Sequence, residues 1–255
     1  MITAGIDCGS KDVKAVVLRD AKVIGKSRVL AGLDTAAAVS AAYDQALAQA
    51  KLARSQIARV VATGAGRKEV AFSPKTVTEV GAAARGANHL FPQGRTVIDV
   101  GAEEGRAIKV DGKGKVVDFA VNEKCAAGAG AFTEAMARAL EVPLEELGAL
   151  SLQSQQAIPM NAQCAVFAES EVVSLVHRKT PKPDIARAVL DAIADRITSM
   201  VRRVGIEEAI VLIGGVAKNV GFVRGLEEDL GIKVLIPADP EYVGALGAAL
   251  IAAEE

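Results

Sequence analysis

The chain has 255 residues and is 51% hydrophobic, so it can bury the core of one large domain or two smaller ones. Aromatic residues make up only 3%, whereas glycine and alanine are frequent, which favours close packing of helices on sheets. The net charge of −1 indicates no nucleic-acid-binding surface. No segment reaches the roughly 18 uncharged apolar residues of a membrane helix. Three cysteines do not make a disulfide framework, so we expect a cytoplasmic protein that binds neither nucleic acid nor membrane.

A pattern near the N-terminus recurs in the middle of the chain. The stretches "GIDCGSKDVKAVVL" and "VIDVGAEEGRAIKV" align when Asp7 is placed on Asp99, and both give a strand, an Asp-x-Gly turn and a second strand. Each copy continues as a hairpin, and the later one turns at Asp111 and Gly112, a strong hairpin signal. The shared layout predicts an internal duplication.

The remaining elements, in chain order, alternate between helices and strands. Apolar periodicity and alanine-rich runs predict helices, whereas short apolar runs predict buried strands. We expect helices at residues 35–52, 78–90, 125–140, 165–178 and 184–204 and from Val243 onwards, and strands at residues 57–63, 209–215 and 232–237. This alternation predicts an α/β fold, with an N-terminal domain of residues 1–92 and a C-terminal domain of residues 93–255.

The two Asp-x-Gly turns suit a nucleotide polyphosphate. Backbone N–H groups at such a turn bind phosphate oxygens, and the carboxylates of Asp7 and Asp99 suit Mg²⁺ or the orientation of an attacking water. A third glycine site, "LIGGVAKNVGFV", ends a strand and opens a helix, where a nucleotide can lie across the backbone. A lone copy would be read as a solvent-facing turn, but three in this order indicate a nucleotide site.

This order of motifs resembles the actin, hexokinase and Hsp70 ATPase superfamily. The resemblance implies two duplicated α/β domains with ATP between them, Asp7 and Asp99 being the catalytic residues. Residues 7–14 would form the first phosphate loop, residues 99–106 the second, and the third glycine site the adenosine end. The implied nucleotide-binding residues are Gly9, Ser10, Lys11, Lys14, Gly101, Gly214, Gly215 and Lys218.

The stretch "NEKCAAGAGAFTEAMARAL" places Cys125 just before a predicted helix, and Cys164 has the same setting. A helix N-terminus favours thiolate character, whereas Cys8 lies inside a predicted strand and is expected to be a buried apolar residue. A zinc or iron–sulfur site normally takes four ligands, so a cluster here would need thiolates from a second subunit. The glycines Gly128 and Gly130 lack the third glycine of a dinucleotide loop, but they would let a nucleotide or a partner backbone approach.

At these residues the resemblance narrows. The stretches "NEKCAAGAGAFTEAMA" and "NAQCAVFAESEVVSL", with "TGAGR", "TEVGAAARGA" and "EYVGALGAAL" in the same order, look like the BadF/BadG/BcrA/BcrD ATPase family. The resemblance implies one [4Fe–4S] cluster shared by two subunits, each giving two cysteines, here Cys125 and Cys164. It also implies that hydrolysis of Mg·ATP to ADP moves the helices that hold the cluster, and that an electron then passes to a partner with the acyl-CoA site.

Departures from the family pattern guide the choice within it. Dehydratase activators usually read Asp-Ile-Gly-Gly-Gln-Asp-Ser-Lys at the second loop, where this chain has "DVGAEEGR". They also usually carry Gln near the positions of Lys218 and Glu241 in this chain. These departures, and Glu103 in the second loop, leave open how the three residues would contact a nucleotide. Glu241 is nevertheless included among the expected nucleotide-binding residues.

We therefore expect an ATPase and electron-transfer subunit of an ATP-dependent benzoyl-CoA reductase, of the small D or G type. Its expected partners are a second homologous ATPase subunit, the acyl-CoA-binding reductase subunits and ferredoxin. The first alternative is a homodimeric activator of a 2-hydroxyacyl-CoA dehydratase. The second, from another class, is a small-molecule kinase of the sugar-kinase type, which needs an acceptor pocket and no iron.

Overall fold

The computed structural model describes residues 1–122, 130–160 and 165–254 of the chain. Contacts divide it into two compact units, which we call the first and the second unit. The first unit comprises Met1–Arg95, Val110–Val117 and Pro237–Glu255, and the second comprises Thr96–Lys109 and Asp118–Ile236. The C-terminal residues thus belong with the N-terminal unit, while the expected domains of residues 1–92 and 93–255 remain a prediction.

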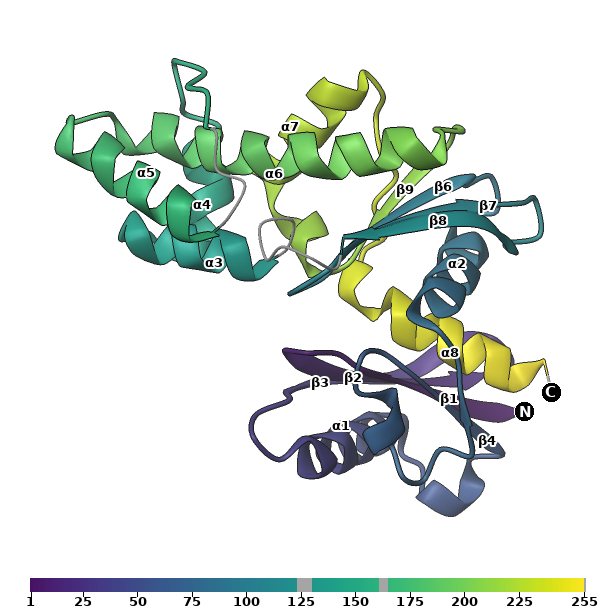
Figure 1. Ribbon diagram of the computed structural model, residues 1–255. Coiled ribbons are helices and arrows are strands. Elements are labelled where there is room, and N and C mark those ends of the chain that lie inside the picture. Colours follow the sequence, from purple (N-terminus) through teal and green to yellow (C-terminus); the bar gives the residue numbers. More distant parts are fainter. Residues whose placement is uncertain (123–129, 161–164, 255) are drawn as a thin grey trace. The chain divides into compact units, whose positions relative to one another are not determined.

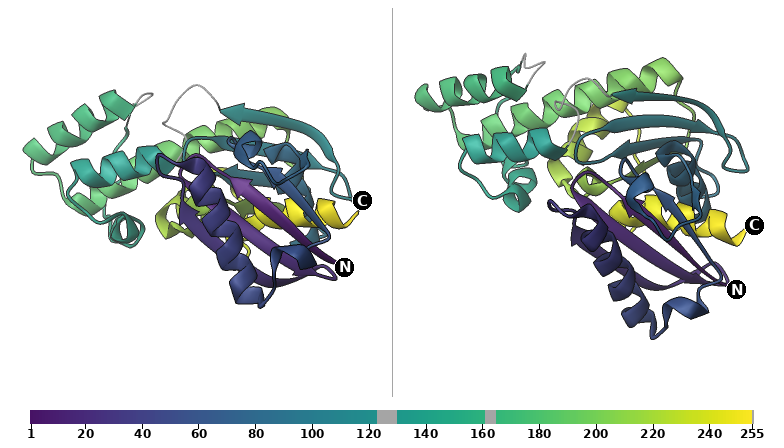
Figure 2. Two further views of the ribbon diagram at one scale, coloured as in Figure 1. Left: turned by 90° about the horizontal axis from the view of Figure 1, so that it is seen from below. Right: turned by 60° about the horizontal axis from the view of Figure 1, so that its bottom comes forward.

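The first unit is a five-stranded sheet between helices. Its strands lie in the order β3-β2-β1-β4-β5, and they are β1 (Ile2–Cys8), β2 (Asp12–Arg19), β3 (Lys22–Leu30), β4 (Arg59–Thr63) and β5 (Lys75–Thr76). β1 pairs antiparallel with β2 and parallel with β4. Helix α1 (Thr35–Ala50) covers one face, whereas α2 (Glu79–Leu90) and α8 (Val243–Ala253) lie on the side of the other (Figure 1, and Figure 2 from two further directions).

The second unit repeats this arrangement in a four-stranded sheet of order β8-β7-β6-β9. Its strands are β6 (Thr96–Val100), β7 (Gly105–Val110), β8 (Val116–Asn122) and β9 (Ile210–Ile213). β6 pairs antiparallel with β7 and parallel with β9, as β1 pairs with β2 and β4. The duplicated α/β layout predicted from the two Asp-x-Gly turns is therefore present.

The helices of the second unit pack around its longest one, α6. They are α3 (Gly130–Ala139), α4 (Leu144–Ser151), α5 (Ala165–His177), α6 (Lys182–Val204) and α7 (Val220–Leu230). Helix α6 buries an apolar stripe that includes Ile185, Val189, Ile193 and Ile197, the spacing that its sequence predicted. Helices α3, α4 and α5 gather beside its N-terminal half (Figure 1). Among the described helices, none is long and apolar enough to span a membrane.

The predicted elements and the structure differ at two places. The strand expected at residues 232–237 is reduced to a single parallel bridge, in which Leu235 pairs with Val211. It occupies the place beside β9 that the two-residue β5 occupies beside β4. The short helix α4 was not predicted, because eight residues are too few for a clear periodic signal. The helix expected at residues 125–140 is described only from Gly130 onwards.

Helix α8 approaches its neighbours closely because glycines and alanines line its contacts. A β-carbon on Gly5 of β1 would lie 2.0 Å from the carbonyl oxygen of Ala245, and one on Gly247 would lie 1.8 Å from that of Ala82 in α2. Neither distance is possible for real atoms, so these positions require glycine. The small residues of the sequence therefore let the backbone of α8 pack directly against the backbones of β1 and α2.

Substitution of Gly247 tests this close packing. Replacing a mid-helix glycine with alanine normally stabilises a protein by about 1 kcal/mol. Here we expect Gly247→Ala to lower the free energy of unfolding by about 1–3 kcal/mol, because the methyl group would overlap the α2 backbone. Urea denaturation measures the change. Gly81→Ala is the matched control, since its β-carbon would meet only the Thr78 side chain, at 3.2 Å. Equal stability of both variants would contradict this packing.

The loop that follows α4 is tied to the start of α6 by Asp184. This carboxylate is 4% exposed, and its Oδ1 accepts hydrogen bonds from the Ser154 hydroxyl at 2.8 Å and from the backbone N–H groups of Gln155 and Gln156 at 2.9 and 3.2 Å. The Ser154 hydrogen bond and these amides hold the pKa of Asp184 below its ordinary value of 3.8.

The contribution of Asp184 to stability should depend on pH. Because its folded pKa is lowered, the unfolded chain takes up a proton first as the pH falls, and the stabilisation is lost toward the folded pKa. We expect Asp184→Asn to be less stable than the unchanged protein at pH 6, and the difference to shrink below about pH 4. Thermal denaturation across this range measures it, with Asp195→Asn, on the exposed face of α6, as control. A difference that stays constant with pH would rule out an ionised, hydrogen-bonded Asp184.

Candidate functional site

The first predicted phosphate loop joins β1 to β2 in the first unit. Asp7 and Lys14 are paired across the two strands, and the Lys14 Nζ lies 3.3 Å from Asp7 Oδ2. The Lys14 side chain is 15% exposed and the Asp7 side chain is 18% exposed, so a ligand can still reach both. The backbone N–H of Gly9 donates to the Asp12 carbonyl at 3.1 Å and closes the turn. The carboxylate of Asp7 and the ammonium group of Lys14 thus lie side by side where the loop meets its two strands.

The second predicted loop joins β6 to β7 and has the same construction within the second unit. Asp99 pairs across the strands with Arg106, whose Nη1 lies 3.1 Å from Asp99 Oδ2. The two partners are seven residues apart, as Asp7 and Lys14 are. The N–H of Gly101 donates to the Glu104 carbonyl at 2.9 Å, which repeats the turn of the first loop. Arg106 also pairs with Glu104, so it lies between two carboxylates.

A glycine from the neighbouring parallel strand packs against each aspartate. Gly64 follows β4 with φ +94°, and a β-carbon there would lie 2.7 Å from Asp7 Oδ1 and 2.3 Å from the Cys8 carbonyl oxygen. Gly214 follows β9 with φ +90°, and its β-carbon would lie 2.8 Å from Asp99 Oδ1 and 2.3 Å from the Val100 carbonyl oxygen. Sequence reasoning identified Gly214 and missed Gly64, although "TGAGR" stands after β4 as "IGGVAK" stands after β9.

Asp7 also faces the beginning of helix α8, which the sequence did not indicate. A β-carbon on Gly244, the second residue of α8, would lie 3.4 Å from Asp7 Oδ2. The first N–H groups of a helix lack intrahelical partners and carry partial positive charge, so they favour an anion placed beside them. Asp7 therefore lies beside Lys14, the strand-end turn and the beginning of α8.

The second loop is bonded directly to the first turn of α3. The N–H of Gly130 donates to the Gly101 carbonyl at 2.9 Å, and the N–H of Ala131 donates to the Ala102 carbonyl at 2.8 Å. Gly130 was predicted to let a nucleotide or a partner backbone approach. Within this unit, the backbone of the second loop lies against Gly130. Its role toward a nucleotide stays a prediction.

The other predicted nucleotide-binding residues are distributed over both units. In the first unit Ser10 and Lys11 are exposed in the first loop, and Glu241 is half-buried in the turn Pro240–Tyr242 before α8. In the second unit Gly215 and Lys218 are exposed in the short helical turn Gly215–Lys218 that follows β9. Their contacts with a nucleotide remain predictions.

The predicted cluster ligands Cys125 and Cys164, and Gly128 beside them, lie outside the described residues. Within the described part of the chain, no three His, Cys, Asp or Glu side chains converge as a metal site. Cys8 is fully buried, as expected, and burial raises the pKa of its thiol to about 11, with a further contribution from the Asp7 carboxylate. Cys8 is therefore protonated near neutral pH and unsuited to metal binding.

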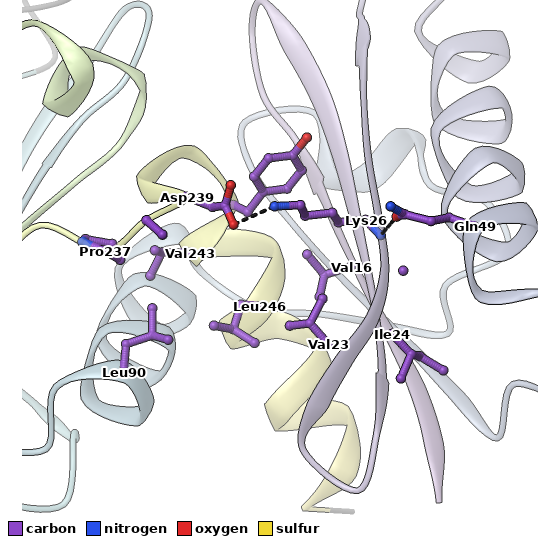
Figure 3. A pocket seen from close by; sticks show the side chains of 13 residues that line it. Val16, Val23, Ile24, Lys26, Gln49, Leu90, Pro237, Asp239, Val243 and Leu246 are labelled. Carbon is purple, nitrogen blue, oxygen red and sulfur yellow. Dashed lines mark hydrogen bonds and ion pairs between the residues drawn. The ribbon is translucent and has the colours of Figure 1, made fainter.

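A cavity of about 400 Å³ lies in the first unit between the β2–β3 hairpin and the start of α8 (Figure 3). Its walls are mostly apolar, and include Val16, Leu90 and Leu246. Lys26 and Asp239 form an ion pair of 2.5 Å across it, and the Lys26 ammonium lies 5.1 Å from the centre of the Tyr242 ring. None of the described site residues predicted from sequence lines this cavity.

Comparison with known proteins gives close relatives over almost the whole chain. The activator of lactoyl-CoA dehydratase from Anaerotignum propionicum is 39% identical over 254 residues, which cover 100% of this chain and 98% of the relative. A benzoyl-CoA reductase subunit of the D type, from Thauera aromatica, is 34% identical over 260 residues, which cover 98% and 92%. The relatives therefore include both classes of protein that the sequence analysis considered.

Solved structures agree with the fold. The (R)-2-hydroxyglutaryl-CoA dehydratase component A of Acidaminococcus fermentans is 36% identical, has a TM-score of 0.96, and matches 100% of this chain and 98% of its own. The activator of 2-hydroxyisocaproyl-CoA dehydratase from Clostridium difficile, solved with bound ADPNP, is 36% identical with a TM-score of 0.95 and matches 100% and 95%. A ROK family glucokinase from Streptomyces griseus, at 16% identity and a TM-score of 0.64, shares the fold alone.

The actin- and hexokinase-like ATPase fold predicted from the motifs is thus confirmed. Residues 4–252 match the family model described as the BadF/BadG/BcrA/BcrD ATPase family, which is the family that the cysteine and glycine motifs indicated. With 36–39% identity to relatives over 96–98% of their length and two strand-end aspartates in equivalent loops, this chain belongs to the BadF/BadG/BcrA/BcrD ATPase family.

Proposed function

We propose that this chain is the ATP-hydrolysing activator of a 2-hydroxyacyl-CoA dehydratase and works as a homodimer. The observation that supports it is identity of 36% to 39% with three proteins named as activators of such dehydratases, over 98–100% of this chain. The benzoyl-CoA reductase subunit is 34% identical. This proposal reverses the preference reached from the sequence, which rested on the "DVGAEEGR" loop and on Lys218 and Glu241, where activators usually carry Gln.

In this proposal the two loops bind the polyphosphate of ATP. The Lys14 ammonium and the backbone of Gly9 and Ser10 bind phosphate oxygens, and the α8 N-terminus adds positive potential beside Asp7. The carboxylates of Asp7 and Asp99 are hard oxygen donors that fit Mg²⁺, directly or through water, and bound Mg²⁺ would neutralise charge on the phosphates. Each carboxylate is held in place by its cation and its glycine, so it is positioned before the nucleotide binds.

Cys125 and Cys164 are the proposed ligands of a [4Fe–4S] cluster shared by two copies of the chain. In the sequence, Cys164 directly precedes α5 and Cys125 stands five residues before α3, which supports this assignment. The third cysteine, Cys8, is buried in a sheet and has a raised pKa. Such a cluster supplies a one-electron centre of low potential when bound. Two thiolates from each of two chains would complete its usual four ligands.

The hydrogen bonds between the second loop and α3 provide a route from nucleotide to cluster. Gly101 and Ala102 accept from the first two residues of α3, and Cys125 stands five residues before that helix in the sequence. A shift of the loop on loss of the γ-phosphate would therefore move the first turn of α3. In this way nucleotide contacts would bias the position of the helix beside a cluster ligand.

A second candidate function is the ATPase subunit of a benzoyl-CoA reductase. The observation that favours it is the acidic second loop, in which Glu104 pairs with Arg106 and Glu103 is exposed. In that case the cluster would bridge this chain and a second homologous ATPase subunit. Acyl-CoA-binding reductase subunits would accept the electron, and ferredoxin would donate it.

Anaerobic expression of the chain alone distinguishes the two functions. We expect a homodimer that contains about four irons, because two thiolates per chain complete one cluster. Cys125→Ser and Cys164→Ser should each lose the iron, whereas Cys8→Ser, the control, should keep it. Iron and sulfide assays with size-exclusion chromatography measure these results. A monomer that takes up iron only when it is expressed with a second ATPase subunit would support the reductase instead.

Removal of one backbone donor tests the proposed route. Ala131→Pro eliminates the N–H that bonds the Ala102 carbonyl, and proline is tolerated in the first turn of a helix. We expect ATP hydrolysis within about twofold of the unchanged protein and ATP-driven electron delivery reduced by about tenfold, the effect of losing a contact worth about 1.4 kcal/mol. Ala131→Ser, which keeps the N–H, is the control. Normal electron delivery by Ala131→Pro would exclude this hydrogen bond as the route.

A further inference from the structure

Thr63 is a buried polar residue that the loops described above do not explain. It is the last residue of β4, and it is 1% exposed. Its Oγ1 has no hydrogen-bond partner among the described residues. Burying a hydroxyl without a partner is unfavourable, and a bound water, an ion or a catalytic role are among the features that account for such groups in native proteins.

The strand register places Thr63 beside Asp7. In the parallel pair of β1 and β4, Asp7 is opposite Thr63, and side chains at such paired positions point to the same face of the sheet. That face is the one covered by α8, because the Thr3 hydroxyl of β1 donates to the Ala249 carbonyl at 2.9 Å and Val61 of β4 packs on Ala248. Thr63 and Asp7 are therefore neighbours under the N-terminal half of α8.

The groups around this point suit a bound water molecule. The Asp7 carboxylate accepts hydrogen bonds, and the Thr63 hydroxyl both donates and accepts them. Helix α8 begins at Val243, and its second residue, Gly244, lies against Asp7. The residue before α8, Tyr242, makes no side-chain cap. A water needs two to four such partners to be held in place.

The second unit shows that the fold itself does not need this hydroxyl. Ile213 is opposite Asp99 in the parallel pair of β6 and β9, and it is buried as Thr63 is. An apolar β-branched side chain thus packs well at the equivalent position. The hydroxyl of Thr63 is specific to the first unit, which points to a use in chemistry and not in packing.

We propose that the Thr63 hydroxyl and the Asp7 carboxylate together hold a water molecule that takes part in ATP hydrolysis. This inference rests on the proposed role of Asp7 at the nucleotide. The water is either a ligand of the bound Mg²⁺ or the nucleophile that attacks the γ-phosphate. If it is the nucleophile, its oxygen bonds to phosphorus as the bond to the ADP oxygen breaks, and its proton leaves toward a neighbouring acceptor such as Asp7.

Substitution of the hydroxyl by a methyl group tests the proposal. We expect Thr63→Val to lower the kcat for ATP hydrolysis about tenfold, because one hydrogen bond to a reacting group is lost. Thermal stability should stay equal or rise, since an unpartnered buried hydroxyl is removed. Thr63→Ser should recover most of the activity. Thr198→Val is the matched control, because Thr198 is also 1% exposed with an unpartnered hydroxyl among the described residues, but lies on α6.

The dependence on Mg²⁺ separates the two kinds of water. A water on the metal predicts that Thr63→Val needs a higher Mg²⁺ concentration and regains its rate when Mg²⁺ is raised; an attacking water predicts a lower kcat at saturating Mg²⁺. Wild-type ATP hydrolysis by Thr63→Val at every Mg²⁺ concentration would overturn the inference and leave the proposed function intact. Wild-type hydrolysis by Asp7→Asn would instead overturn the proposed role of Asp7, and this inference with it.

Discussion

The arrangement of the site depends on the close approach of a glycine to a strand-end aspartate. At Gly64 and Gly214 the backbone adopts φ values of +94° and +90°, and any β-carbon would overlap the carbonyl that follows the aspartate. Each glycine therefore fills the space on one side of the carboxylate, against Oδ1, while the cation of the neighbouring strand lies against Oδ2. The parallel pairing of β1 with β4 and of β6 with β9 makes this geometry possible twice.

The two loops share their backbone but differ in charge. Residues 7–14 carry two aspartates and two lysines, whereas residues 99–106 carry three carboxylates and one arginine. The neutral first loop, with an ammonium group and a helix N-terminus beside Asp7, favours phosphate oxygens. The more acidic second loop favours a divalent cation. The duplicated backbone therefore carries two different chemical environments.

Small residues connect the core to the site. Helix α8 packs on β1 and α2 with backbone against backbone, so that its N-terminus lies at the Asp7 carboxylate. In the second unit, α3 begins on the carbonyls of the second loop through two hydrogen bonds. Each loop is therefore attached to a helix terminus, in one case by steric fit and in the other by hydrogen bonds. In the proposed function, these attachments carry a change at the nucleotide to the rest of each unit.

The sequence by itself determined the duplicated α/β fold, the two Asp-x-Gly loops and the family, because strand periodicity, Asp-x-Gly turns and helix amphipathicity are local signals. It also predicted that Cys8 is buried, since an apolar strand surrounds it. Only the tertiary structure showed that Gly64 matches Gly214, that α8 returns to Asp7 and that Thr63 lies beside the same carboxylate. Those relations join residues far apart in the chain. They depend on strand register and on how closely a helix approaches a sheet, and neither is encoded in a short stretch of sequence.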